Sequence, residues 1–126
     1  MNRPRRVLGG IAAWFVLAVI AAASWALAQD PQSTPQRGQA LYDEHCFRCH
    51  GLTGQGDGPE AKTLTVRPAN FRSARSRAKT DFELLTIIGY GIAYSPMHAW
   101  RSRLTEEEIL DVLDYIRTMA PYEPSL

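Results

Sequence analysis

Cys46-Phe47-Arg48-Cys49-His50 is the stretch around which the rest of this chain is organised. It is a Cys-x-x-Cys-His pattern, which is typical of covalent attachment of a c-type haem. Two thiols three positions apart on one helical turn can reach the two vinyl groups of the macrocycle and form thioethers. The histidine that follows Cys49 then supplies the proximal nitrogen ligand of the iron. The motif therefore predicts one haem c, attached through Cys46 and Cys49 and ligated by His50.

Other uses of paired cysteines fit this sequence less well. A structural zinc site needs four ligands, commonly from two Cys-x-x-Cys pairs, but the chain has two cysteines and its three histidines do not complete a zinc spacing. A redox dithiol needs a β-α-β context, and no strand-like run precedes Cys46. A disulfide between the two cysteines would leave His50 unexplained. The sequence therefore favours haem.

Composition indicates one small domain. The chain has 126 residues, and its 14 basic side chains nearly balance its 13 acidic ones, so charge gives no indication of a nucleic-acid partner. Residues 29–126 alone are short for a self-sufficient hydrophobic core. A covalently bound haem would stabilise so small a domain, because it adds a large apolar surface to the core and its covalent bonds constrain the chain.

Residues 1–28 are predicted to be a targeting segment. Three arginines precede residues 7–28, which carry no charge, and Ala26-Leu27-Ala28 has the form of a cleavage site. We expect a secretory signal peptide. The alternative is an uncleaved membrane anchor, because an uncharged stretch of this length can span a bilayer. Either form predicts a periplasmic domain, which is free after cleavage or tethered to the outer face of the inner membrane.

A helix is expected to follow the linker at residues 29–35 and to run into the haem motif. Ser33 or Thr34 can serve as its N-cap, with Pro35 in the first turn. Gly38 lies inside this helix, where glycine costs about 1 kcal/mol relative to alanine. A close helix crossing would explain a glycine in that place.

The segment that follows the motif is predicted to be a loop. Residues 51–58 contain four glycines, which exclude helix and strand, and backbone without side chains can pass close to the haem edge and His50. Residues 60–66 are expected to form a short helix. Five cations then follow, and they lie either in a solvated loop or, together with Asn70, against the haem propionates or an acidic partner. These cations are Arg67, Arg72, Arg75, Arg77 and Lys79.

Two capping boxes mark two further helices. The first begins with Thr80 and predicts a helix from Asp81 to Ile88. The second begins with Thr105 and predicts a helix to about Met119. Each has an apolar stripe at helical spacing, and no strand is indicated, so we expect an all-α fold. The stripes consist of Phe82, Leu85 and Ile88 in the first helix, and of Ile109, Val112, Leu113 and Ile116, with Tyr115 beside them, in the second.

The second axial ligand of the iron decides the function, because an open position binds gases or peroxide, whereas two strong ligands suit electron transfer. Met1 belongs to the targeting segment, His45 adjoins Cys46 on the wrong side of the ring, and Met119 fits the core stripe. Met97 or His98 remains. A thioether ligand would raise the reduction potential and a histidine would lower it.

With these features in place, the chain resembles the small class I cytochromes c of bacteria. The resemblance covers about residues 36–120, and residues 121–126 would form a tail. It implies a small all-α cytochrome c fold, in which three to five helices wrap around one covalently bound haem. It rests on Gly38 to Tyr42, Cys46 to Gly51, Gly56 to Pro59, Gly89, Met97, Trp100, Leu104-Thr105 and Asp114 to Arg117.

The resemblance also implies roles for single residues. His50 and Met97 would ligate the iron, and the Pro59 carbonyl would accept the ring N–H of His50. The family usually has proline directly after its methionine ligand, whereas here Pro96 precedes Met97 and His98 follows it. His98 therefore stays the alternative ligand.

The resemblance further implies that Gly38 and Tyr42 meet the last helix near Val112 and Tyr115. The expected function is that of a monohaem electron carrier between redox partners such as a dehydrogenase and an oxidase, without a reaction of its own. Two alternatives stay open. One is a dedicated electron-transfer subunit of a larger dehydrogenase or oxidase, and the other is a haem sensor or peroxidase with a labile sixth ligand.

Overall fold

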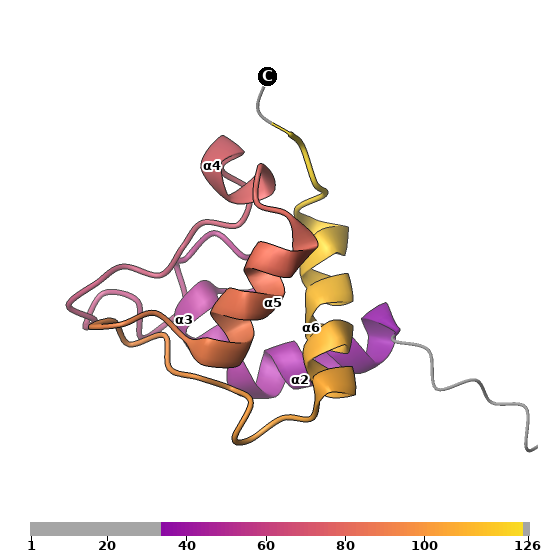
Figure 1. Ribbon diagram of the computed structural model, residues 1–126. Coiled ribbons are helices and arrows are strands. Elements are labelled where there is room, and N and C mark those ends of the chain that lie inside the picture. Colours follow the sequence, from indigo (N-terminus) through magenta and orange to yellow (C-terminus); the bar gives the residue numbers. More distant parts are fainter. Residues whose placement is uncertain (1–33, 125–126) are drawn as a thin grey trace, which may run out of the picture. The chain divides into compact units, whose positions relative to one another are not determined.

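The computed structural model describes residues 34–124, so the predictions for residues 1–28, Ser33 and the last two residues of the tail lie outside the described residues. The described part is all-α, as expected, and contains no strand. None of its helices is long and apolar enough to cross a membrane. The helices are α2 (Pro35–His45), α3 (Phe47–His50), α4 (Ala74–Arg77), α5 (Asp81–Tyr90) and α6 (Glu106–Met119), as Figure 1 shows.

The three longer helices begin where the sequence predicts. Thr34 caps α2 by accepting the Arg37 N–H, with Pro35 in the first turn. Thr80 and Thr105 open α5 and α6 with complete capping boxes, in which the threonine hydroxyl and the glutamate three positions later each accept a backbone N–H. Local hydrogen bonding therefore fixes the start of each of these helices.

The secondary structure differs from the expectation in three places. Residues 60–66 form turns and bends rather than a helix. The short helix α4 was not predicted; Ser73 caps it by accepting the Ser76 N–H. Helix α5 continues past Ile88 to Tyr90 and leaves Phe82 79% exposed, so its apolar stripe is only partly buried. Gly89 lies inside the last turn of α5, and the chain leaves the helix at Gly91 instead.

Helices α2 and α6 cross in close contact (Figure 1). A Cβ atom on Gly38 would lie 1.8 Å from the Asp111 carbonyl oxygen, so only glycine allows the two backbones to meet at this distance. Next to this contact the rings of Tyr42 and Tyr115 pack edge to face, with centroids 5.3 Å apart. The predicted contact of Gly38 and Tyr42 with the last helix is confirmed.

A buried carboxylate strengthens the same crossing. Asp111 is 1% exposed and accepts hydrogen bonds from the Thr34 N–H (2.6 Å) and the Arg37 guanidinium (3.1 Å). Arg37 also pairs with the exposed Glu107. A buried charge is tolerated only when its partners replace water, and here those partners both belong to the first turn of α2. The pairing therefore fixes the rotation of α2 against α6.

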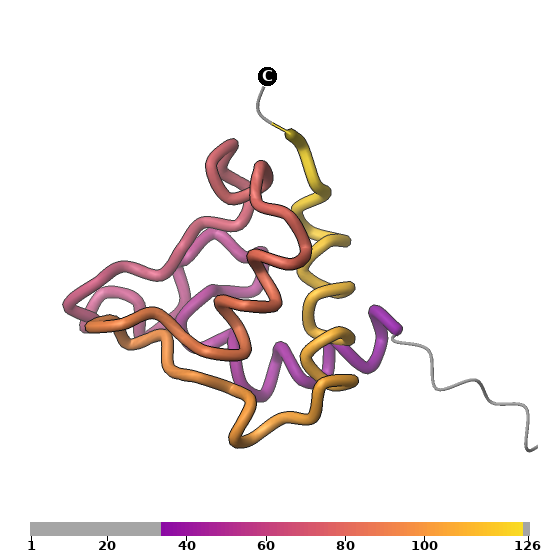
Figure 2. The backbone as a smooth tube through the Cα atoms, viewed as in Figure 1, coloured from indigo at the N-terminus to yellow at the C-terminus, as the bar shows by residue number. Residues whose placement is uncertain are grey.

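The core forms where α2, α5 and α6 meet. Two long loops, residues 51–73 and 91–105, lie on one side of this helical core in Figure 2 and close a space beside α3. The predicted stripe of α6 is buried as expected. The buried core residues are Tyr42, Ile88, Trp100, Leu104, Ile109, Val112 and Ile116.

Replacing Gly38 with alanine should destabilise the protein. Helix propensity alone would favour alanine by about 1 kcal/mol, but the clash with Asp111 should outweigh this and lower the free energy of unfolding by about 1–3 kcal/mol. Denaturant unfolding of the haem-loaded protein would measure the change.

Gly89→Ala is the matched control, because its Cβ would meet only carbons of the flexible Arg101 side chain, at 3.2 and 3.3 Å. That variant should be as stable as the parent or more stable. Equal stabilities of Gly38→Ala and Gly89→Ala would show that the crossing does not need a glycine.

Candidate functional site

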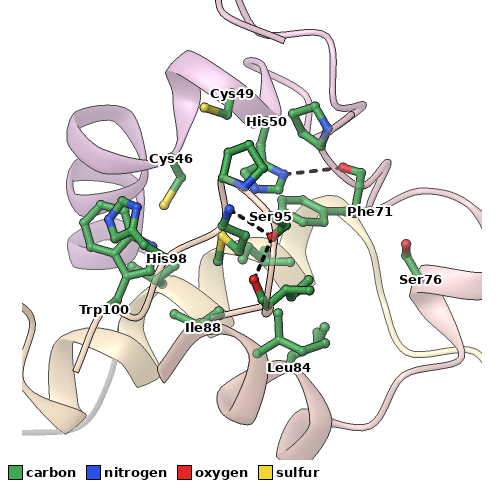
Figure 3. Close-up of a pocket in the computed structure, with 18 of the residues that line it drawn as sticks. Cys46, Cys49, His50, Phe71, Ser76, Leu84, Ile88, Ser95, His98 and Trp100 are labelled. Atoms are coloured by element: carbon green, nitrogen blue, oxygen red, sulfur yellow. Dashed lines mark hydrogen bonds between the residues drawn. The ribbon is translucent and has the colours of Figure 1, made fainter. Parts of the chain in front are cut away.

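The predicted haem motif lies at the junction of α2 and α3. Cys46 ends α2, where its N–H donates to the Tyr42 carbonyl (2.8 Å), and it also precedes the first turn of α3. The N–H groups of Cys49 and His50 both donate to the Cys46 carbonyl, at 3.2 and 2.9 Å. One tight turn of backbone therefore presents both thiols and the imidazole to the same space (Figure 3).

The glycine-rich loop folds back over α3 and fixes this turn. Gly58 has no room for a side chain, because a Cβ there would lie 2.4 Å from the Arg48 carbonyl oxygen. The buried Tyr42 hydroxyl donates to the Gly51 carbonyl at 2.7 Å. The loop thus satisfies carbonyl groups at the end of the helix that would otherwise lack partners. The loop N–H groups of Gly56, Gly58 and Glu60 donate to the carbonyl oxygens of His50, Cys49 and Arg48, at 2.9, 3.2 and 2.9 Å respectively.

A cavity of about 230 Å³ lies against the motif (Figure 3). Its walls are mainly apolar and come from α5, α6 and both long loops. Among the described residues its charged lining side chains are the cations Arg67, Lys79 and Arg117, and none is acidic. Arg117 is already paired with Asp81 at 2.7 Å, and the other two cations form no ion pair with another described residue. The apolar lining includes Leu84, Ile88, Trp100, Val112 and Ile116.

These features fit a haem. Haem is a flat apolar ligand that carries two propionate groups, and this cavity combines apolar walls with two cations, Arg67 and Lys79, that form no ion pair within the described part of the chain. Within residues 34–124 no cluster of three or more His, Cys, Asp or Glu side chains could bind a metal ion directly. The donor set therefore suits an iron held in a macrocycle rather than a structural zinc.

The pKa values of the two thiols argue against a redox dithiol. Burial raises the pKa of Cys46 to about 12 and also raises the pKa of Cys49. Reactive Cys-x-x-Cys pairs instead have a thiol with a lowered pKa, because the thiolate is the nucleophile. Both cysteines are free, without a disulfide between them. They are therefore available for bonds to another group.

His50 is held by two neighbours that the sequence did not indicate. Its Nδ1 lies 3.4 Å from the Ala69 carbonyl oxygen, and the Phe71 ring stacks on the imidazole with centroids 4.5 Å apart. Burial lowers the pKa of His50, although the Ala69 hydrogen bond opposes this shift. The ring is thus oriented and favoured in the neutral form that binds iron.

The structure does not show the predicted role of Pro59. No hydrogen bond between Pro59 and His50 is found within residues 34–124, and Ala69 provides the acceptor nearest to Nδ1. Pro59 is exposed beside Gly58, whose N–H is bound to the Cys49 carbonyl. The assignment of the Pro59 carbonyl therefore stays a prediction. The contacts of Ala69 and Phe71 have no spacing signal in the sequence, because a loop of about 20 residues separates them from His50.

Met97 and His98 both line the cavity but differ in their surroundings. Met97 is half-buried and packs against the hydrophobic core, whereas His98 is exposed and lies against Trp100 with ring centroids 4.4 Å apart. His45 also lines the cavity, and its ring centroid lies 5.2 Å from that of Trp100. The expectation that His45 lies on the wrong side of the haem ring stays a prediction.

Comparison with known proteins agrees with this geometry. A family model described as cytochrome c matches residues 35–120. No curated protein sequence matches the chain. Solved structures with similar folds include a chain of the Kuenenia stuttgartiensis reducing HAO-like protein complex Kustc0457/Kustc0458 and the KustC0563 c-type cytochrome.

The two structures differ in length. The first is 22% identical with a TM-score of 0.63, and the alignment covers 68% of this chain and 43% of that chain. The second is 28% identical with a TM-score of 0.56, and the alignment covers 65% of this chain and 95% of that chain. This chain therefore spans less than half of the first structure's chain, and that likeness concerns the fold alone.

The matched domain, the two free cysteines and the acid-free apolar cavity agree with one another. They identify covalently bound haem c as the cofactor and electron transfer as the function. The chain belongs to the cytochrome c family.

Proposed function

We propose that Cys46 and Cys49 attach one haem c, and that His50 and Met97 are its axial iron ligands. The observation that carries this proposal is that all four side chains line a single apolar cavity. When bound, haem c supplies an iron that alternates between the ferrous and the ferric state. We also propose that the protein catalyses no reaction of its own and passes single electrons between other proteins.

The neighbours of each ligand support these roles. Ala69 and Phe71 orient the neutral His50 imidazole, so little rearrangement would accompany a change in charge at the iron. Met97 is the better candidate for the second ligand because it is half-buried against the core, whereas His98 is exposed on Trp100. Residues of α5 and α6 give the cavity apolar walls, and a thioether ligand favours ferrous iron.

Residues 61–80, which we call the cationic flank of the cavity, carry a strong positive charge. Residues 61–80 contain six cations and no acidic residue, and within residues 34–124 Arg77 alone of these cations forms an ion pair, with Glu123. Arg67 and Lys79 line the cavity and can meet the haem propionates, whereas Arg72 and Arg75 are exposed. Charges of one sign around a cofactor steer oppositely charged molecules toward it. We therefore propose exported redox proteins with an acidic docking face as partners.

A periplasmic location follows from the predicted targeting segment 1–28. Cleavage would give a diffusing carrier, and retention would give a carrier that serves neighbours in the membrane. A dedicated subunit of a larger dehydrogenase or oxidase would use the same site chemistry. Co-purification of such an enzyme with the exported protein would distinguish the subunit from the diffusing carrier.

Replacing Met97 with alanine should lower the midpoint potential by on the order of 0.1 V, because a thioether ligand raises the potential of a haem. The reduced variant should also bind carbon monoxide. Potentiometric titration and carbon monoxide difference spectra would measure both effects. His98→Ala is the matched control next to it and should leave the potential and the spectrum unchanged. An unchanged potential in Met97→Ala together with a changed potential in His98→Ala would assign the sixth ligand to His98.

Removing charge from Arg72 and Arg75 should change reaction rates with charged reagents in opposite directions. We expect Arg72→Gln/Arg75→Gln to react more slowly with ferricyanide and faster with a cationic cobalt phenanthroline complex. The effect should be roughly tenfold or less at low ionic strength and should shrink in salt. Stopped-flow kinetics would measure it.

The control for the double variant is Arg101→Gln, since Arg101 is already paired with Glu106 and does not line the cavity. This change should have little effect on either rate. If the double variant and the control behave alike, the cationic flank does not steer electron transfer.

A further inference from the structure

The loop that carries Met97 is closed by its own hydrogen bonds. The Ile92 N–H donates to the Met97 carbonyl at 2.8 Å. The Met97 N–H donates to the Ser95 Oγ at 3.2 Å, and the same hydroxyl donates to the Ile92 carbonyl at 3.0 Å. Both polar groups of the Met97 backbone are thus bound within residues 92–97. Figure 3 shows the Ser95 hydroxyl at the centre of these bonds.

Gly91 forms the second restraint on Met97. Its φ is +74°, a left-handed conformation that residues with a side chain rarely adopt. A Cβ atom on Gly91 would lie 2.7 Å from the Met97 carbonyl oxygen and 2.7 Å from the His98 carbonyl carbon. Both are backbone atoms, so a rotamer change could not relieve the overlap. The backbone around Met97 would have to move.

The end of α5 next to Gly91 is held in place by hydrogen bonds and by the core. Gly91 ends α5, and its N–H donates to the Ile87 carbonyl at 2.9 Å. The returning chain is fastened to the same end of α5, because the Trp100 N–H donates to the Ile88 carbonyl at 3.1 Å. Ile88 and Trp100 are both buried in the core. A side chain at position 91 would therefore displace the segment that carries Met97 rather than α5.

We propose that Gly91 and Ser95 are positioning residues for the sixth ligand and that they control how readily an external molecule displaces Met97. Gly91 sets the distance between this segment and α5, and Ser95 holds the Met97 backbone in the turn. A bound thioether has to leave before a small ligand can reach the iron. This inference rests on the proposed role of Met97 as ligand.

The test compares three single variants with the parent: Gly91→Ala, Ser95→Ala and the control Gly89→Ala. Gly89 lies two residues earlier in α5, and its Cβ would approach only the Arg101 side chain. Carbon monoxide binding to the reduced protein is followed by stopped flow, together with the midpoint potential and thermal unfolding. We expect binding to be about tenfold faster or more in Gly91→Ala and faster by a smaller factor in Ser95→Ala. Gly89→Ala should match the parent.

The outcomes separate this inference from the proposed function. Rapid carbon monoxide binding by the parent itself would overturn the role of Met97, and with it this inference. A slow parent with equally slow Gly91→Ala and Ser95→Ala would overturn this inference alone. Faster binding, or a lower potential because His98 replaces Met97, would support it. Should Gly91→Ala fail to fold, the milder Ser95→Ala decides, because it removes one hydroxyl and creates no clash.

Discussion

The close contact between Gly38 and Asp111 is the constraint on which the rest of the structure depends. It brings α2 and α6 together at backbone distance, and the buried Asp111 carboxylate then fixes the first turn of α2 through Thr34 and Arg37. Helix α2 ends at His45 with Cys46 as its C-cap, so this crossing also determines where the haem motif begins. A side chain at position 38 would move both the core and the cofactor site. In a domain of this size the core and the cofactor site cannot form independently, because the haem-binding turn is the continuation of a core helix.

At three places in the structure a glycine allows two segments of backbone to pack closely. Gly38 allows two helices to meet, Gly58 allows a loop to lie against α3, and Gly91 allows the Met97 segment to lie against α5. Each replaces a side chain with close backbone packing, and two of them contact residues proposed to bind or ligate the haem: Gly58 contacts Cys49 and Gly91 contacts Met97. The cofactor site is thus held mainly by backbone contacts and hydrogen bonds, and its walls are free to be apolar. This arrangement suits a site that has to keep its geometry while the charge on the iron changes.

Local patterns predicted much of this structure. The threonine caps, the α6 stripe and the motif Cys46 to His50 all depend on residues within one or two turns, so their spacing is visible in the sequence. The glycine inside the first helix predicted a close helix crossing, and the resemblance to the class I cytochromes c implied that the last helix is its partner. The partners of His50 could not be predicted. Ala69 and Phe71 reach it only after the chain has passed through the turns at residues 60–66, which were wrongly expected to be helical.

The central claim is that two protein ligands hold the iron, and the visible spectrum of the reduced, exported protein with and without carbon monoxide tests it most directly. The cavity places His50 and Met97 around one apolar space, and both are restrained by their neighbours. We expect a low-spin spectrum that carbon monoxide leaves unchanged on the time scale of mixing. Rapid formation of a carbon monoxide complex would contradict it, since the sixth position would then be open and the protein would be suited to binding gases or peroxide.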